Sequence, residues 1–245
     1  MLLAIDIGNT NISFGIFQGK KLKKRFCIPT KDYAARNLKI LIKGFKIDDA
    51  IICSVVPKVS MILENDINNI VGKRPKVVGR DIMVPIKNRY RDPKQVGQDR
   101  LVNAYAGIIL YGAPLIAVDF GTAITFDVIS RDKEYLGGMI LPGIQISLNA
   151  LARDTALLPK IKVGRPKEFI GKDTSSSMLS GVVYGFSALT LQMIKFLKHK
   201  IGNNAFTIGT GGDVSLIKRY CNTFDAVDKD LTLKGLNLLR KRFLL

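Results

Sequence analysis

Two stretches of sequence, Ala4-Ile-Asp-Ile-Gly-Asn-Thr-Asn11 and Ala117-Val-Asp-Phe-Gly-Thr-Ala-Ile124, decide the fold. Each has an aspartate, Asp6 or Asp119, at the end of a short apolar run and a glycine two residues later. Glycine lets the backbone bend and bring N–H groups close to an anion. A carboxylate beside such a turn is suited to hold a cation that neutralises the anion, directly or through water. One such turn is common between strands, but two copies predict a duplicated domain with a polyphosphate held between the halves.

The composition is that of a globular protein, with 245 residues of which 47% are hydrophobic and 24% are charged. This length allows one large domain or two small ones, and the repeat favours two, residues 1–112 and 113–245. Asp6 and Asp119 interrupt two of the most apolar runs, so we expect no membrane span. Cys27 and Cys53 lie in apolar runs and are predicted to be buried, inert thiols. We therefore expect a cytoplasmic protein without a membrane partner.

The net charge of +18 is the one unusual bulk property. The basic residues are spread along the chain and are densest in Lys20–Arg25, Lys87–Arg100 and Arg240–Arg242. These segments lack the interleaved aromatic residues of single-strand binders and the spacing of helix-turn-helix or zinc-finger proteins. We interpret the charge as a solvated surface that would also attract anionic substrates, and we keep nucleic-acid binding as the less favoured alternative.

Hydrophobic periodicity predicts clusters of strands followed by helices, twice along the chain. In the first half we predict strands at 2–5, 12–17, 22–28, 50–56 and 76–78, and helices at 32–43, 59–71 and 98–111. In the second half we predict strands at 115–118, up to 129, near 135 and at 206–208, and helices at 144–152, 176–199, 214–220 and 231–242. Residues 84–96 are predicted to form a long loop, and long ordered loops often carry function. This order indicates an α/β protein with two similar lobes.

A series of short motifs has the order and spacing of a known family, although each motif alone is weak. They are Asp6-Ile-Gly-Asn-Thr-Asn-Ile-Ser13, Ser54-Val-Val-Pro57, Gly97-Gln-Asp-Arg100, Asp119-Phe-Gly-Thr-Ala123, Gly137-Gly138 with Leu141-Pro-Gly143, Thr155-Ala-Leu-Leu-Pro159, Thr174-Ser-Ser-Ser-Met178 with Ser180-Gly181, and Gly209-Thr-Gly-Gly212. With them the chain resembles the type III pantothenate kinases, the actin-like-fold enzymes that begin coenzyme A biosynthesis. The resemblance implies two actin-like (ribonuclease H-like) lobes with an active-site cleft between them. It also implies ATP-dependent phosphorylation of pantothenate to 4′-phosphopantothenate.

The resemblance assigns the nucleotide site to both aspartate turns. Asp119 matches an aspartate that binds a monovalent cation, K⁺ or NH₄⁺, and Asp6 would help to place Mg²⁺, directly or through water. The residues that would contact ATP are Asp6, Ile7, Gly8, Asn9, Thr10, Asn11, Ile12, Ser13 and Thr122.

Phosphoryl transfer needs positioning, charge neutralisation and an oriented nucleophile. The resemblance makes Asp99 the acceptor of the hydroxyl proton, and Arg100 beside it would supply a fixed cation for an anionic substrate. Asp173 departs from the family pattern, since a neutral polar residue is expected there. An aspartate followed by an arginine at a helix start is, taken alone, more often a helix cap. The residues that would contact pantothenate are Tyr90, Gly97, Gln98, Asp99, Arg100 and Thr174.

The resemblance also implies a homodimer, because the dimers of this family bury acceptor-site residues at the subunit contact. The apolar segment Ile144–Leu158 is a candidate for that contact, with a core helix as the equal alternative. Two other functions stay open at this point. One is a nucleic-acid-binding transcriptional accessory protein, which some relatives suggest, and the other is a sugar kinase or an ATPase of the same fold.

Overall fold

The structure is a computed structural model in which residues 1–240 are described, and the chain falls into two compact units. Unit 1 comprises residues 1–86, 91–106 and the C-terminal segment that starts at Leu231, and unit 2 comprises residues 87–90 and 107–230. The C-terminal segment thus packs in unit 1, although it follows unit 2 in the sequence. The lobe division between residues 112 and 113 stays a prediction, and each unit is described by itself.

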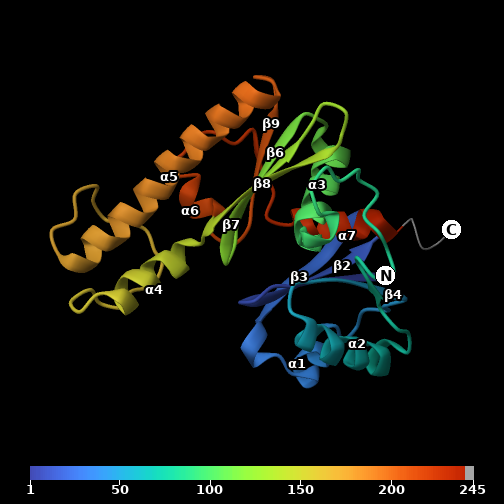
Figure 1. Cartoon of the computed structure of the whole chain (residues 1–245). Helices are drawn as coiled ribbons and strands as arrows, with labels where there is room; N and C mark the ends of the chain where they lie inside the picture. Colours follow the sequence, from blue (N-terminus) through green and yellow to red (C-terminus); the bar gives the residue numbers. More distant parts are fainter. Residues whose placement is uncertain (241–245) are drawn as a thin grey trace. The chain divides into compact units, whose positions relative to one another are not determined.

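Unit 1 is built on a five-stranded mixed sheet. Its strands are β1 (Leu2–Ile7), β2 (Asn11–Gln18), β3 (Lys21–Pro29), β4 (Asp49–Ser54) and β5 (Lys76–Val77), in the order β3-β2-β1-β4-β5. The hairpin pairs β1/β2 and β2/β3 are antiparallel, whereas β4 pairs parallel to β1 and β5 parallel to β4. Helices α1 (Ala35–Leu41) and α2 (Pro57–Val71) lie on one face, and α7 (Leu231–Leu239) lies on the other (Figure 1). Burial on both faces explains why β1 and β4 are almost wholly apolar.

Unit 2 repeats this topology. Its strands are β6 (Leu115–Phe120), β7 (Ala123–Ile129), β8 (Tyr135–Pro142), β9 (Phe206–Thr210) and β10 (Ala226–Val227), in the order β10-β9-β6-β7-β8. Again the first three strands are antiparallel, and two parallel strands extend the sheet beyond the first strand. The helices of unit 2 are α4 (Ile144–Asp154), α5 (Thr174–Ile201) and α6 (Val214–Ile217). The predicted α/β fold with two similar halves is confirmed, and Asp6 and Asp119 occupy the same position, the last but one of β1 and of β6.

Most predicted elements are present, and the differences lie at their ends. The predicted helix at 32–43 is a short 3₁₀ turn η1 (Thr30–Asp32) followed by α1, and the predicted helix at 214–220 is the shorter α6. The region 84–96 is a loop that contains an isolated β-bridge from Asn88 to Tyr135 and the 3₁₀ turn η2 (Pro93–Gln95), after which α3 (Gln98–Tyr111) begins. Of the closing helix predicted at 231–242, residues 241 and 242 lie outside the described residues.

The prediction that Cys27 is buried was wrong. Cys27 is exposed, because it lies on the same solvent-facing side of β3 as Lys21, Lys23 and Arg25. The alternation of basic and apolar residues along β3 carries this information, since side chains alternate between the two faces of a strand. Basic residues on an edge strand also hinder pairing with another chain.

Helix α5 is long and apolar enough to cross a membrane by length and composition alone, with a mean hydropathy of 1.3 over its most apolar window. A core helix of a globular protein meets the same criterion. α5 packs against α4 and α6, and its buried residues include Val183 and Ile194. We therefore interpret α5 as a packing helix of unit 2.

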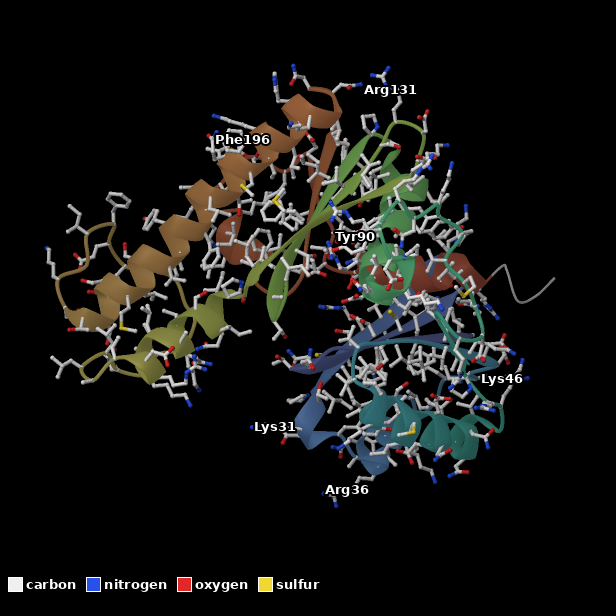
Figure 2. All side chains as sticks on the ribbon, in the orientation of Figure 1. Lys31, Arg36, Lys46, Tyr90, Arg131 and Phe196 are labelled. Carbon is white, nitrogen blue, oxygen red and sulfur yellow. The ribbon has the colours of Figure 1, made fainter. Side chains whose placement is uncertain are left out.

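Exposed basic side chains lie on different parts of both units. Lys31, Arg36 and Lys46 project outward from separate parts of unit 1, and Arg131 projects from a turn of unit 2 (Figure 2). This distribution fits the interpretation of the net charge as a solvated surface.

Candidate active site

The first aspartate turn connects β1 to β2 and is closed by backbone contacts. Gly8 donates its N–H to the Asn11 carbonyl oxygen at 2.9 Å, and its own carbonyl oxygen accepts the Thr30 hydroxyl at 2.7 Å. A Cβ atom on Gly8 would lie 3.1 Å from the Asn11 oxygen, so a larger residue would crowd the turn. Ile7 and Ile12 are buried on either side and fix the turn to the core. The three residues at its tip, Asn9, Thr10 and Asn11, are exposed.

Asp6 and Asp99 both act electrostatically on the same buried side chain of unit 1, that of Cys53. Asp6 on β1 is in register with Cys53 on the parallel strand β4, so the two side chains point to the same face of the sheet. Burial raises the pKa of the Cys53 thiol, and the negative charges of Asp6 and Asp99 raise it further. The thiol is thus a buried, neutral group close to two carboxylates that lie 93 residues apart in the sequence.

Asp99 lies in the first turn of α3, and its carboxylate folds back toward the preceding loop. Asp99 Oδ1 accepts the backbone N–H of Arg100 at 2.9 Å. A Cβ atom on Gly97 would lie 2.5 Å from the same Oδ1, so only glycine leaves room for the carboxylate. Burial raises the pKa of Asp99, although the Arg100 N–H and the Arg100 charge lower it in part. Arg100 is only 7% exposed, so this aspartate–arginine pair is not a solvated cap.

The second aspartate turn, in unit 2, is surrounded by glycines. Asp119 Oδ1 lies where a Cβ atom on Gly211 would be only 2.4 Å away, and Gly211 has a φ of +92°. A Cβ atom on Gly143 would lie 2.3 Å from the Thr122 carbonyl oxygen, which accepts the Gly143 N–H at 3.1 Å. The segments that follow β8 and β9 therefore lie at van der Waals distance from this turn. Thr122 itself is exposed.

Tyr90 and Thr174 occupy separate parts of unit 2. The Tyr90 ring lies 3.5 Å from the Cβ position of Gly137 on β8, and Tyr90 donates its backbone N–H to Asn88 Oδ1 at 2.9 Å. Thr174 is the first residue of α5, whose first turn lies at the end of the α4–α5 pair remote from the sheet (Figure 1). Asp173, the unexpected acidic residue, is the N-cap of α5 and forms a capping box with Ser176. The Asp173 carboxylate thus caps the N-terminal end of α5, and hydrogen bonds from Ser176 lower the pKa of Asp173.

Either aspartate could contribute to a site that a bound phosphate completes. Within residues 1–240 no three His, Cys, Asp or Glu residues gather into a metal cluster. Mg²⁺ in kinases typically takes one or two carboxylates together with phosphate oxygens and water, so a single aspartate such as Asp6 fits that role. Asp119 Oδ1 lies close to the backbone of Gly211 and Gly121, and a single carboxylate of this kind can serve as one ligand of a cation.

The sequence profile of the family described as type III pantothenate kinase matches residues 2–195. The chain belongs to this family. The predicted membership of this family is confirmed. The predicted class of enzyme, an ATP-dependent kinase, is confirmed with it. A type III pantothenate kinase from Agathobacter rectalis is 40% identical to this chain over 253 residues, which cover 99% of this chain and 97% of the relative.

Two solved structures show the same fold over nearly the whole chain. A candidate Baf family transcriptional activator from Campylobacter jejuni aligns with a TM-score of 0.62 and 24% identity, covering 99% of this chain and 98% of its own. An activator of 2-hydroxyisocaproyl-CoA dehydratase from Clostridium difficile, with bound ADPNP, aligns with a TM-score of 0.55 and 12% identity, covering 99% and 97%. Both similarities concern the fold alone. The alternative of a nucleic-acid-binding accessory protein is not favoured, because the family match is to kinases.

Sequence reasoning missed Cys53 and Gly79 as neighbours of the candidate site. Cys53 could have been found, because it stands at the same distance from the end of an apolar strand as Asp6 does. The contact of Gly79 with Gln98 carries no such local signal.

Proposed function

We propose that this pantothenate kinase transfers the γ-phosphoryl group of ATP to the terminal hydroxyl of pantothenate, with Asp99 as the proton acceptor. The hydroxyl oxygen forms the new bond to phosphorus, the bond between the γ-phosphorus and the bridging oxygen breaks, and ADP leaves. The hydroxyl proton passes to the Asp99 carboxylate. The observation that carries this proposal is that Asp6 and Asp99 both act electrostatically on the buried Cys53 side chain.

The nucleotide would be held by the residues of the first turn and by Thr122. The exposed tip at Asn9–Asn11 offers backbone N–H groups and short polar side chains to phosphate oxygens. Ser13 stands opposite Asp6 on β2, so the two side chains lie on the same face of the sheet. Mg²⁺ bound with ATP would neutralise phosphate charge, and Asp6 would hold it directly or through water. Asp119 would bind K⁺ or NH₄⁺, which supplies further positive charge.

The acceptor would be held by the start of α3 together with Tyr90 and Thr174. A raised pKa suits Asp99 to accept a proton, because a basic carboxylate takes a proton more readily in the transition state. Arg100 offers a fixed cation to the pantothenate carboxylate or to the transferred phosphoryl group. Gly97 and Gln98, at the N-terminal end of α3, would contact pantothenate at the same place.

The protein would act as a homodimer in the cytoplasm, without a membrane or nucleic acid as a partner. The loop between α4 and α5 exposes large apolar side chains, since Leu157, Phe169 and Ile170 are 90%, 68% and 76% exposed. On α4 itself, Leu148 is buried and Leu151 is 37% exposed, so this helix serves both the core and an outer face. A second copy would cover these side chains, and Thr174 follows Ile170 closely enough to lie within such a contact. Light scattering of the purified protein tests this, and Phe169→Lys with Leu157→Lys should yield monomers.

A coupled assay of ADP release tests the function. Purified protein with Mg²⁺, K⁺ and ATP should turn over only when pantothenate is added, and not with hexoses or N-acetylhexosamines. Replacing K⁺ by Na⁺ should lower the rate of the wild type far more than that of Asp119→Asn. The absence of pantothenate-dependent turnover would falsify the proposal, whereas turnover with a sugar would point to the other kinases of this fold.

A further inference from the structure

Gly79 lies against the side chain of Gln98, the residue that begins α3. A Cβ atom on Gly79 would lie 2.7 Å from Gln98 Cδ and 2.8 Å from Gln98 Cγ, both too close for any side chain. Gln98 Oε1 is buried and has no hydrogen-bond partner within residues 1–240. Packing against the bare backbone of Gly79 is therefore a main constraint on where the Gln98 side chain lies.

The turn that contains Gly79 is held at both ends. Gly79 has a φ of +85°, and it donates its N–H to the Ile82 carbonyl oxygen at 2.8 Å. Asp81 Oδ2 accepts the Val77 N–H at 2.8 Å, so the side chain of Asp81 closes the turn back onto β5. The residues 77–82 thus form a compact turn that presents Gly79 toward Gln98.

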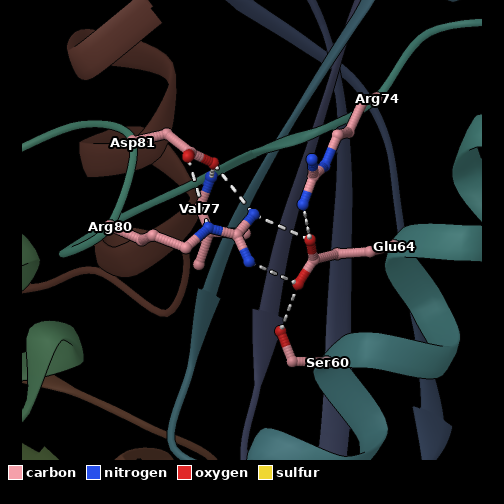
Figure 3. A network of polar contacts seen from close by, with 6 residues as sticks. All are labelled: Ser60, Glu64, Arg74, Val77, Arg80 and Asp81. Carbon is pink, nitrogen blue, oxygen red and sulfur yellow. Dashed lines mark hydrogen bonds and ion pairs between the residues drawn. The ribbon is translucent and has the colours of Figure 1, made fainter.

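Arg80 joins this turn to α2 (Figure 3). Its two terminal nitrogens donate to both carboxylate oxygens of Glu64, at 3.2 and 2.7 Å, and it also donates to Asp81 at 3.0 and 3.2 Å. Glu64 is only 7% exposed, and Ser60 donates a further, longer hydrogen bond to it at 3.4 Å. A two-point contact of this kind fixes the direction of a guanidinium group as well as its distance. Arg74 also reaches Glu64, but at 3.8 Å.

We propose that Gly79 and Arg80 are positioning residues that set the place of Gln98, and through it the start of α3 with Asp99. The chain of contacts runs from Glu64 on α2 through Arg80 to the Gly79 turn, and from Gly79 to Gln98 next to the proton acceptor. This inference rests on the proposed role of Asp99. It assigns the Glu64–Arg80 pair a part in the transfer reaction, although neither residue is among those proposed to contact the substrate.

The test compares Gly79→Ala with Gly72→Ala. Gly72 ends α2 with a φ of +75° and has no atom within 4 Å of its Cβ position, so both variants place alanine in a left-handed conformation and only one meets Gln98. We expect Gly79→Ala to lower kcat by about tenfold or more, since a displacement near 1 Å can reduce a rate about 10²-fold. We expect the KM for ATP to stay within about twofold of the wild-type value, as should all kinetic constants of Gly72→Ala. Equal kcat values for the two variants would overturn the proposal.

A double-mutant cycle separates positioning from loss of structure. In the Gln98→Ala background the new methyl group has nothing to displace, so adding Gly79→Ala should change kcat less than twofold. A full further loss in that background would contradict a route through Gln98. If Gly79→Ala does not fold, Arg80→Lys against Arg74→Lys serves instead. Lysine keeps the charge and loses the two-point contact, so only the Arg80 variant should lower kcat, by about threefold or more, and equal effects would refute the role of Arg80.

A second readout does not depend on turnover. The side-chain amide signal of Gln98 in ¹H–¹⁵N spectra, assigned by its loss in Gln98→Ala, should shift in Gly79→Ala and Arg80→Lys but not in Gly72→Ala. If the wild type fails to phosphorylate pantothenate, the proposed function fails while this spectrum still tests the contact. If the wild type is active and the Gln98 signal is unmoved in both variants, the positioning role is wrong and the function stands.

Discussion

Replacing Gly97 by alanine should reduce the kinase rate far more than the stability of the fold. The new Cβ atom would lie 2.5 Å from Asp99 Oδ1, whereas ordinary contact begins near 3.4 Å. The carboxylate must therefore move by about 0.9 Å, because the backbone on both sides is fixed by the Val96 core contact and by α3.

The size of the effect follows from this displacement. A misplacement near 1 Å at a reacting group corresponds to a loss of about 10²-fold in rate, or about 2.7 kcal/mol in activation free energy. Gly97 does not have a positive φ, so alanine is compatible with its backbone. Such a change usually alters the free energy of unfolding by less than about 1 kcal/mol.

Steady-state kinetics measure the effect on the kinase rate, and thermal unfolding measures the effect on the stability of the fold. We expect kcat to fall about 10²-fold while the melting temperature stays within a few degrees of the wild-type value. Gly164→Ala is the control, since no atom lies within 4 Å of its Cβ position and its φ is not positive. A Gly97→Ala enzyme that keeps more than half of the wild-type kcat would refute the placement of Asp99. A rise in the pantothenate KM without loss of kcat would mean that Gly97 acts by binding substrate.

Three further predictions concern charged groups. Asp99→Asn should abolish turnover while ATP binding stays measurable by calorimetry. Burial raises the pKa of Asp99, so the native protein keeps this carboxyl group protonated at pH values where the unfolded chain has already lost the proton. As pH rises from the unfolded pKa through the folded pKa, ionisation of Asp99 therefore lowers the stability of the wild type. The free energy of unfolding of Asp99→Asn, measured by denaturation, should therefore rise relative to that of the wild type as pH increases from about 4. Asp173→Ala removes the N-cap of α5 and should lower the urea concentration at the unfolding midpoint, whereas Asp154→Ala, at an exposed position that caps no helix N-terminus, should leave the midpoint close to the wild-type value. Glu134, whose pKa is lowered to about 2 by hydrogen bonds from Arg89 and Lys87, ties the segment before Tyr90 to β8, so Glu134→Gln should raise the pantothenate KM and leave the ATP KM unchanged in the coupled assay.

The duplicated fold could be predicted from the sequence because its signals are local. An aspartate at a strand end followed by glycine marks each first strand, and the order of strands and helices then repeats. Element ends were less certain for physical reasons. The predicted helix at 32–43 begins only at Ala35, after the 3₁₀ turn at Thr30–Asp32, because local hydrophobic spacing does not encode where a helix packs.

The surroundings of the site could not be predicted, because they depend on contacts between distant segments. Nothing in the local sequence indicates that residues 79 and 98 meet, or that the end of β9 approaches Asp119. The exposure of Cys27, by contrast, could have been predicted, because the alternation of basic and apolar residues along β3 indicates which of its sides faces solvent. Convergence of Asp6, Asp99 and Asp119 on one phosphoryl group stays a prediction, since Asp119 belongs to the other unit.

The loss of stability at Asp99 distinguishes a proton acceptor from a helix cap. A cap on a surface helix stabilises the protein by accepting N–H groups while its charge stays in water. Asp99 is instead buried enough to raise its pKa, so its charge is unfavourable to folding at neutral pH. The space for its carboxylate also excludes any side chain at Gly97. Two features that do not serve stability meet at one carboxylate, as expected if Asp99 has the proposed role of proton acceptor.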